Sequence, residues 1–247
     1  MEDFGTTALL MGAAAALLVG FSKTGMPGAA IPAVALMAEA FPEQTRLSVG
    51  ALLPILLVGD LFALGYYRRH ADWTRLLELV PYVLVGMIPG YLVLATVPDG
   101  ILRRLLGAIV LGLLGIQLAR QWLGWQPLPD RRWLVGGTGL LAGFGTTVGN
   151  AAGPVMSIYL VGQKLGKQEF LGTAAWFFFV VNLSKIPGFV LLGMITPRTL
   201  TFDLLVAPVV MIGALIGVSV LKRLPQGVFN ALVLCLAGVA AVRLLFF

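Results

Sequence analysis

Charged residues are scarce in this sequence. Lysine, arginine, aspartate and glutamate make up 11% of its 247 residues, whereas about 25% is usual in soluble domains. Hydrophobic residues make up 59%, and the mean hydropathy is +0.95. A soluble fold of this size has no room to bury so much apolar surface, so we expect lipid to be the solvent. The composition predicts an integral membrane protein.

Cysteine and histidine are scarcer still, and this excludes several functions. Cys235 is the single cysteine and has no partner for a disulfide within the chain, and His70 is the single histidine. The sequence contains no His, Cys and Glu cluster that suits a metal. The nucleotide-binding pattern GxxxxGKS/T is absent, as is the Gly-x-Ser-x-Gly pattern of hydrolases. We therefore expect no catalytic residues, no metal and no cofactor.

The chain repeats itself. With a shift of 127 residues, segment 81–100 aligns with segment 208–227, and five positions are identical: Pro81, Gly86, Gly90, Pro98 and Gly100 match Pro208, Gly213, Gly217, Pro225 and Gly227. Upstream, the same halves align Gly20-Phe21 with Gly143-Phe144, Gly50 with Gly172, and Asp60 with Asn182. We predict a first repeat at 1–123, a polar linker at 124–132 and a second repeat at 133–247, all within one membrane domain.

Ten apolar stretches are visible, and the short ones hold corresponding places in the two halves. They cover 5–21, 25–41, 46–67, 75–98, 101–123, 133–148, 150–163, 169–194, 203–222 and 227–247. The first two and the sixth and seventh are short for a spanning helix, which needs about 20 residues. Glycine-rich and proline-rich breaks at 22–28 and at 145–150, followed by Gly153-Pro154, divide each short pair. Because broken backbone cannot face lipid, these breaks must lie inside the protein or line a wet cavity.

The number of crossings sets the relation between the halves. Each short pair returns to its starting side, whether it spans twice or enters as a hairpin, so each half crosses an odd number of times. The second half is then inverted relative to the first. We predict an all-α helical bundle of two inverted-topology repeats, with broken helices or re-entrant hairpins and 8–10 membrane segments, as in many secondary transporters.

Loop charges predict the orientation. One side collects ten basic residues: Arg68, Arg69, Arg75, Arg120, Arg131, Arg132, Lys164, Lys167, Lys222 and Arg223. The other collects five: Arg46, Arg103, Arg104, Arg198 and Arg243. Basic loops are mostly cytoplasmic, so both termini are predicted outside. The net charge of +6 follows from these loops, and we expect membrane lipid rather than nucleic acid as a partner.

The two breaks hold the first candidate binding residues. A helix that begins or ends inside the membrane exposes backbone N–H groups, and its dipole favours anions. The inverted halves would bring both breaks together near the midplane. We therefore predict a small anionic substrate bound by Ser22, Lys23, Thr24 and Gly25 from one break and by Thr146, Thr147 and Asn150 from the other. The alternative is that the glycines only allow close helix crossing and that Lys23 reaches the interface.

Three further polar residues lie deep in apolar stretches. A lysine near mid-bilayer costs at least about 2.5 kcal/mol, so Lys185 should face the protein interior, unless it reaches water near a helix end. Asn182 lies three residues earlier on the same helix face. We predict that both contact the substrate. Asp60, the repeat mate of Asn182, is either a proton carrier or a counter-ion to Lys23 or Lys185.

Four segments resemble the TauE/SafE sulfite exporter family, also called TSUP: GFSKTGMPG at 20–28, GDLFALGYYRRHADW at 59–73, GNAAGPVMSIYL at 149–160 and GTAAWFFFVVNLSKIPG at 172–188. The resemblance runs from about residue 5 to the C-terminus. It implies a transporter in the bacterial inner membrane that exports sulfite, sulfoacetate or related sulfonates. An uptake permease, an anion channel and a membrane scaffold are the alternatives. A homodimer is a further expectation, because the glycine faces Gly86/Gly90 and Gly213/Gly217 suit packing either within the chain or between two copies.

Overall fold

The computed structural model describes residues 4–25, 30–123, 132–163, 165–220, 242 and 245–246, and most of these residues are helical. Their order is α1 (Thr6–Thr24), α2 (Ile31–Ala40), α3 (Thr45–Tyr67), a short 3-10 turn (Arg68–His70), α4 (Trp73–Thr96), α5 (Asp99–Leu123), α6 (Arg132–Gly149), α7 (Gly153–Gly162), α8 (Lys167–Leu191) and α9 (Pro197–Val220). No strand occurs within these ranges. Most of the predicted linker and of the last apolar stretch, 227–247, lies outside the described residues.

Five of the described helices are long and apolar enough to cross a membrane: Thr6–Thr24, Thr45–His70, Trp73–Thr96, Gln168–Leu191 and Pro197–Ser219. The predicted all-α, polytopic membrane architecture is confirmed. The first stretch differs from expectation, because α1 continues three residues beyond Phe21 and so reaches spanning length. α2 remains short, with 10 residues.

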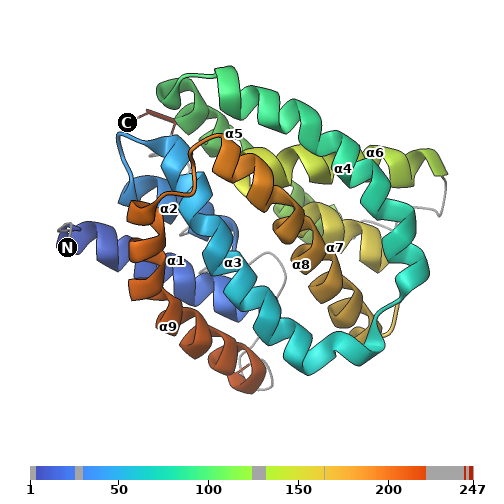
Figure 1. Ribbon diagram of the computed structural model, residues 1–247. Helices are drawn as coiled ribbons and strands as arrows, with labels where there is room; N and C mark the ends of the chain where they lie inside the picture. The colour runs from blue at the N-terminus through green and yellow to red at the C-terminus, as the bar shows by residue number, and fades with distance from the viewer. Residues whose placement is uncertain are drawn as a thin grey trace.

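Two repeat-related helices, α3 and α8, form the centre of the bundle (Figure 1). They run antiparallel, because Gly50 near the start of α3 packs on the backbone of Met194 just after α8, while Gly172 near the start of α8 packs on the backbone of Tyr67 at the end of α3. Gly50 and Gly172 are repeat mates. A two-fold axis that relates two antiparallel spanning helices lies in the membrane plane, so the contacts give the halves the predicted inverted relation.

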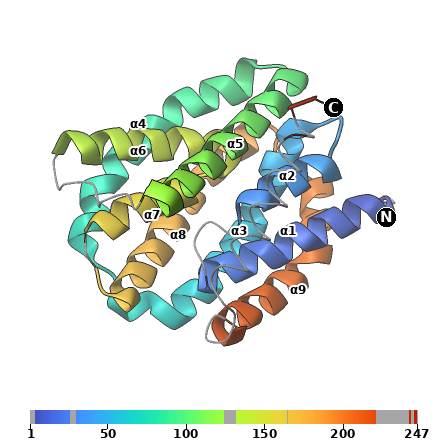
Figure 2. The same cartoon turned by 180° about the vertical axis from the view of Figure 1, so that it is seen from behind.

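A crossed pair of helices lies on each side of this centre. α1 packs along α9 on one side, and α4 packs along α6 on the other (Figures 1 and 2). Gly20 meets the backbone of Val210, and its repeat mate Gly143 meets the backbone of Val83. Positions 83 and 210 are also repeat mates. Each pair therefore joins one helix from each half, and glycine allows the backbones to approach closely enough for dispersion contacts along the crossing.

The glycine faces identified in the sequence pack within the chain. Gly86 meets the backbone of Leu140, and Gly213 meets the backbone of Leu17, which is the repeat-equivalent contact. Gly90 packs on the Thr147 side chain, and Gly217 likewise on Thr24. Small residues here serve helix crossing inside one molecule.

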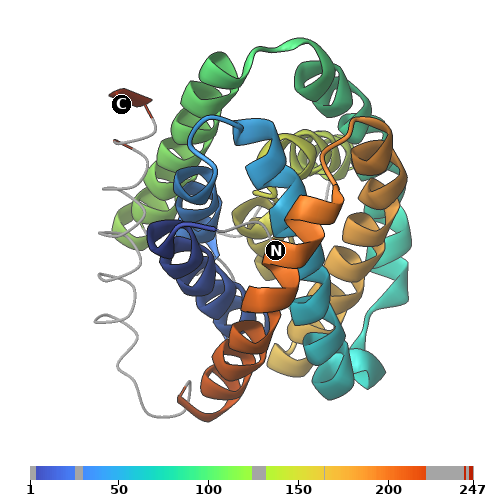
Figure 3. The ribbon, with the colours of Figure 1, turned by 60° about the vertical axis from the view of Figure 1, so that its left-hand side comes forward.

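The short helix α2 lies inside the bundle, between α1, α3 and α5 (Figure 3). Eight of its ten residues are buried, Ile31 and Met37 among them. A short apolar helix that is buried along most of its length packs on protein, and its first residues, Ile31 and Pro32, are buried. This placement brings the start of α2 toward the ends of α1 and α6.

Candidate functional site

The polar residues of the site lie where α1 and α6 end inside the bundle. α1 runs through Thr24, and the N–H of Gly25 donates to the Phe21 carbonyl oxygen at 2.9 Å. α6 ends at Gly149, after which Asn150 adopts a left-handed conformation with φ of 52° and donates its N–H to the Thr146 carbonyl oxygen at 3.0 Å. This arrangement is an αL cap, for which asparagine is suited. Both breaks thus start later than the sequence suggested, and the residues before them occupy last helical turns.

The first cluster joins both halves through an ion pair and an amide. The Lys23 Nζ lies 2.6 Å from an oxygen of Asp60, with side chains 9% and 0% exposed. The Asn182 side chain donates to the other Asp60 oxygen at 2.6 Å. Asp60 and Asn182 are repeat mates, so their direct contact places the two-fold axis at this point. The Lys23 ammonium also lies 4.1 Å from the centre of the Phe178 ring, which adds a cation–π contact.

The second cluster surrounds Lys185, which is fully buried. Its Nζ donates to the side-chain oxygen of Asn150 at 2.5 Å and to the carbonyl and hydroxyl oxygens of Thr146, each at 3.2 Å. The Asn150 amide nitrogen in turn donates to the carbonyl oxygen of Val49 on α3 at 3.0 Å. Lys185 is therefore held by neutral oxygens at the carboxyl end of α6, where the helix dipole favours a cation.

The charges at the site do not balance. Lys23 has the Asp60 carboxylate as a partner, whereas the hydrogen bonds of Lys185 go to the neutral oxygens of Thr146 and Asn150. With Lys23, Asp60 and Lys185 all ionised, two positive charges face one negative charge. Buried unpaired charge is costly in a membrane, and intramembrane ionisable residues usually mark a ligand or ion pathway. The arrangement therefore favours an added anion.

A cavity of about 60 Å³ adjoins the clusters. Since one water needs roughly 10–15 Å³ by this measure, the space suits a ligand of a few heavy atoms. The lining residues come from the ends of α1 and α6, the starts of α2 and α7, and the middle helices α3 and α8: Ser22, Lys23, Ala30, Ile31, Val34, Leu56, Ala63, Thr146, Asn150, Ala151, Gly153, Leu171, Ala174, Ala175, Phe178 and Asn182. Most of the wall is apolar, and the polar groups belong to the clusters just described.

The partial positive charge near the cavity comes from the starts of α2 and α7, the short helices that follow the two breaks. Ala30 and Ile31 border the cavity at the start of α2, and Ala151 and Gly153 border it at the start of α7. Lys23 and Thr146 instead belong to the carboxyl ends of α1 and α6. The amino-terminal dipoles of the two short helices add favourable potential for an anion.

Four predicted binding residues do not line the cavity, and three of them, Thr24, Thr147 and Gly25, lie at the helix crossings. The Thr24 hydroxyl donates to the Gly20 carbonyl oxygen at 3.2 Å and to that of Ala214 at 2.8 Å. The Thr147 hydroxyl donates to the Gly143 carbonyl oxygen at 2.8 Å. Gly25 packs on the backbone of α9. These residues belong to the helix crossings, whereas Ser22, Lys23, Thr146, Asn150 and Asn182 line the cavity and Lys185 lies directly behind Asn150 and Thr146.

Two residues at the site were missed by sequence reasoning. Phe178 lies one helical turn before Asn182, and this spacing is the only sequence signal that it shares a face with the amide. Gly59 precedes Asp60 and makes room for Lys23, because a Cβ there would lie 3.0 Å from the lysine Cγ. Aromatic and glycine residues are common in membrane helices, so composition alone does not single these two out.

Comparisons with known proteins identify the family. No curated protein and no solved structure matches the chain in these comparisons. A family model described as "Sulfite exporter TauE/SafE" matches residues 8–244, which is nearly the whole sequence and includes both repeats and every residue of the two clusters. The chain therefore belongs to the sulfite exporter TauE/SafE family of membrane transporters.

Proposed function

We propose that the protein is a secondary transporter of small organosulfur anions, sulfite, sulfoacetate or a related sulfonate, and that it exports them across the bacterial inner membrane. The observation that carries the proposal is the charge imbalance at the cavity. Lys23 is paired with the Asp60 carboxylate, whereas the Lys185 ammonium is held by the neutral oxygens of Thr146 and Asn150. A bound monoanion would complete the neutralisation, and family membership supports a sulfur oxyanion.

The cavity chemistry suits an oxyanion. A sulfonate or sulfite accepts several hydrogen bonds in different directions, and Ser22, Thr146, Asn150 and Asn182 are the polar side chains around the space beside Lys23. The starts of α2 and α7 add dipole potential without further formal charge. In this proposal the anion sits between the ion pair on α1/α3 and the amide cluster on α6/α8, so it contacts both halves. Asp60 serves as the counter-ion of Lys23.

Contact with both halves favours alternating access. If one half rocks against the other, the same residues bind the anion from each side in turn. In the predicted orientation both termini lie in the periplasm. The membrane potential, negative inside, favours outward movement of an anion by about 2.3 kcal/mol per charge per 100 mV. Transport then needs no enzymatic step and no cofactor.

Reconstituted vesicles test the proposal. Vesicles loaded with unlabelled sulfite or sulfoacetate should accumulate the labelled anion faster than empty vesicles, and the rate should saturate with concentration. Chloride and sulfate are the comparison anions. A rate that rises linearly with concentration, without stimulation by internal substrate, would show a channel instead. No flux of any sulfur anion above protein-free vesicles would reject the proposed function.

A further inference from the structure

The cavity is unequal on the two sides of the two-fold axis. On α8 it touches Phe178 and Asn182 near the middle of the helix and also Leu171, Ala174 and Ala175, which lie toward the start of that helix. Phe178 has its repeat mate, Leu56, in the lining as well, but the three residues nearer the start of α8 do not. The repeat mates of Leu171, Ala174 and Ala175 on α3, at a shift of 122, are Val49, Leu52 and Leu53. Of the described α3 residues, the cavity touches only Leu56 and Ala63, which lie further along the helix.

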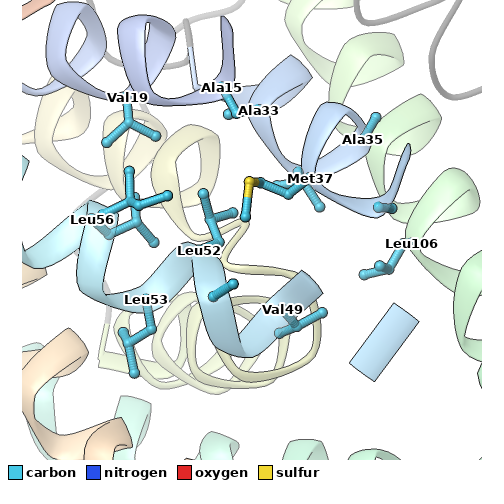
Figure 4. Packing of buried hydrophobic residues seen from close by; sticks show 14 of the residues in the cluster. Ala15, Val19, Ala33, Ala35, Met37, Val49, Leu52, Leu53, Leu56 and Leu106 are labelled. Carbon is cyan, nitrogen blue, oxygen red and sulfur yellow. The ribbon is translucent and has the colours of Figure 1, made fainter. Parts of the chain in front are cut away.

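The equivalent wall on α3 is closed by packing. Val49, Leu52 and Leu53 are 2%, 2% and 0% exposed and belong to the largest apolar cluster. Leu52 points from α3 toward Met37 of α2, and Val49 lies on the side toward Leu106 of α5 (Figure 4). Equivalent positions in the two halves thus have different surroundings: cavity on one side of the axis and dense core on the other.

We propose that Val49, Leu52 and Leu53 line the second half of the transport pathway, which is closed in this state and opens at the Thr45 end of α3 when the cavity at the His70 end closes. The inference rests on the proposed alternating transport. In an inverted repeat, exchange of the conformations of the two halves produces the oppositely open state from the same set of contacts. A residue that is packed in the core in the present state then has the surroundings that its repeat mate has now, and the mate becomes packed.

Exchange of the conformations of the two halves gives the two lysines different roles in binding. Ala63 lines the present cavity, and its repeat mate is Lys185, which does not. In the oppositely open state Lys185 lines the pathway. Lys23 and Thr146 are mates of each other and both line the cavity now, so both line it in either state. The anion is accordingly held by Lys23 throughout and meets Lys185 on the Thr45 side.

Asn150 connects the site to the closed wall. Its amide nitrogen donates to the Val49 carbonyl oxygen at 3.0 Å, while its oxygen accepts from Lys185 at 2.5 Å. Asn150 also lines the cavity. An anion that draws the Lys185 ammonium or the Asn150 amide toward itself weakens the tie to Val49. Asn150 is thus a positioning residue that links occupancy of the site to release of the α3 wall.

Thiol accessibility tests the inference in the full-length protein. In a Cys235→Ser background, Val49→Cys and its repeat mate Leu171→Cys are compared in oriented vesicles with a charged, membrane-impermeant methanethiosulfonate added to one side at a time. Val49→Cys is close in volume and leaves the backbone carbonyl in place. Leu183→Cys, on the outer face of α8 with 49% of the parent leucine exposed, sets the background for reaction through lipid.

Leu171→Cys should react from the His70 side. Val49→Cys should react only from the Thr45 side and about tenfold or more slowly, as expected for a minor state of 10% or less. Asn150→Ala should speed the Val49→Cys reaction and slow that of Leu171→Cys. A Val49→Cys protein that transports but never reacts, or that reacts from the His70 side, overturns the inference while the proposed function stands. If the thiols react in the expected pattern but the protein moves no sulfur anion, the inferred pathway is supported and the proposed substrate is rejected.

Discussion

The two halves bury one lysine each, and they stabilise it in different ways. In the first half Lys23 pairs with a carboxylate, Asp60, at 2.6 Å. In the second half the hydrogen-bond partners of Lys185, within the described part of the chain, are the neutral oxygens of Thr146 and Asn150. The helix crossings around them are nearly identical, with the same glycine positions and the same threonine hydroxyl bonds. The two halves thus share their packing but differ in the partners that they offer to the lysine at the centre.

The largest expected effect comes from Asp60→Asn, which removes the one carboxylate of the cluster. Breaking a buried ion pair by deleting one partner costs about 3–5 kcal/mol, because the other charge stays buried. We expect a loss of that size in denaturation of the purified protein, together with loss of flux. The exposed pair Arg75–Glu78, at 3.3 Å, supplies the matched control: Glu78→Gln should change stability by less than about 1 kcal/mol. Equal stability of the two variants would contradict the paired cluster.

Next come Gly20→Ala and Gly143→Ala, which test the shared packing. An added Cβ at either position would clash with a carbonyl of the partner helix, so the helices must separate. Overpacking of this kind costs about 1–3 kcal/mol, and the repeat predicts similar losses for both. At Gly137 in α6 an added Cβ would have no described atom within 4 Å, so Gly137→Ala should stabilise by up to about 1 kcal/mol through helix propensity. A large loss at only one of the two crossings would break the symmetry of the packing.

The smallest effect is expected from the threonines at the crossings. Thr24→Val removes one hydroxyl, whose single proton is within reach of the Gly20 and Ala214 carbonyl oxygens, and Thr147→Val removes one that donates to Gly143. One such bond contributes about 0.5–1.5 kcal/mol, so each variant should lose about that much in thermal denaturation. Flux should survive both changes, whereas Thr146→Val, which deletes a hydroxyl acceptor of Lys185, should reduce it. A Thr24→Val protein that folds but does not transport would show that Thr24 acts in substrate binding and not only at the helix crossing.

Much of this arrangement is visible in the sequence, for physical reasons. Glycines at fixed spacing in both halves predict close helix crossings, because only glycine tolerates another backbone at that distance. Asp60 and Asn182 stand out since polar residues deep in apolar segments need partners. The helix ends were harder to predict. Ser22, Lys23 and Thr24 look like loop residues next to Gly25 and Pro27, yet the Gly25 N–H still closes the last turn of α1.

The partner choices were not predictable from the sequence. Both lysines were candidates for the single carboxylate, and spacing does not say which one reaches it. Lys23 reaches Asp60 because Gly59 leaves room for its stem, while the left-handed cap at Asn150 turns an amide toward Lys185. Thr24 and Thr147 shared every sequence signal with Thr146, but helix periodicity points them to the crossing instead of the cavity. Which of two adjacent threonines faces the cavity depends on how the helices pack, and the sequence does not show it.

Ligand-induced stabilisation in wild type and Lys185→Met tests the charge excess most directly. Lys185→Met removes the positive charge that has no carboxylate, so the variant should fold at least as well as wild type. With sulfite or sulfoacetate at 100 times its dissociation constant, the free energy of unfolding of the wild-type protein should rise by about 2.7 kcal/mol. The account predicts that this gain is reduced in Lys185→Met and persists in Leu183→Met, a control on the outer face of the same helix. An undiminished gain in Lys185→Met would contradict it.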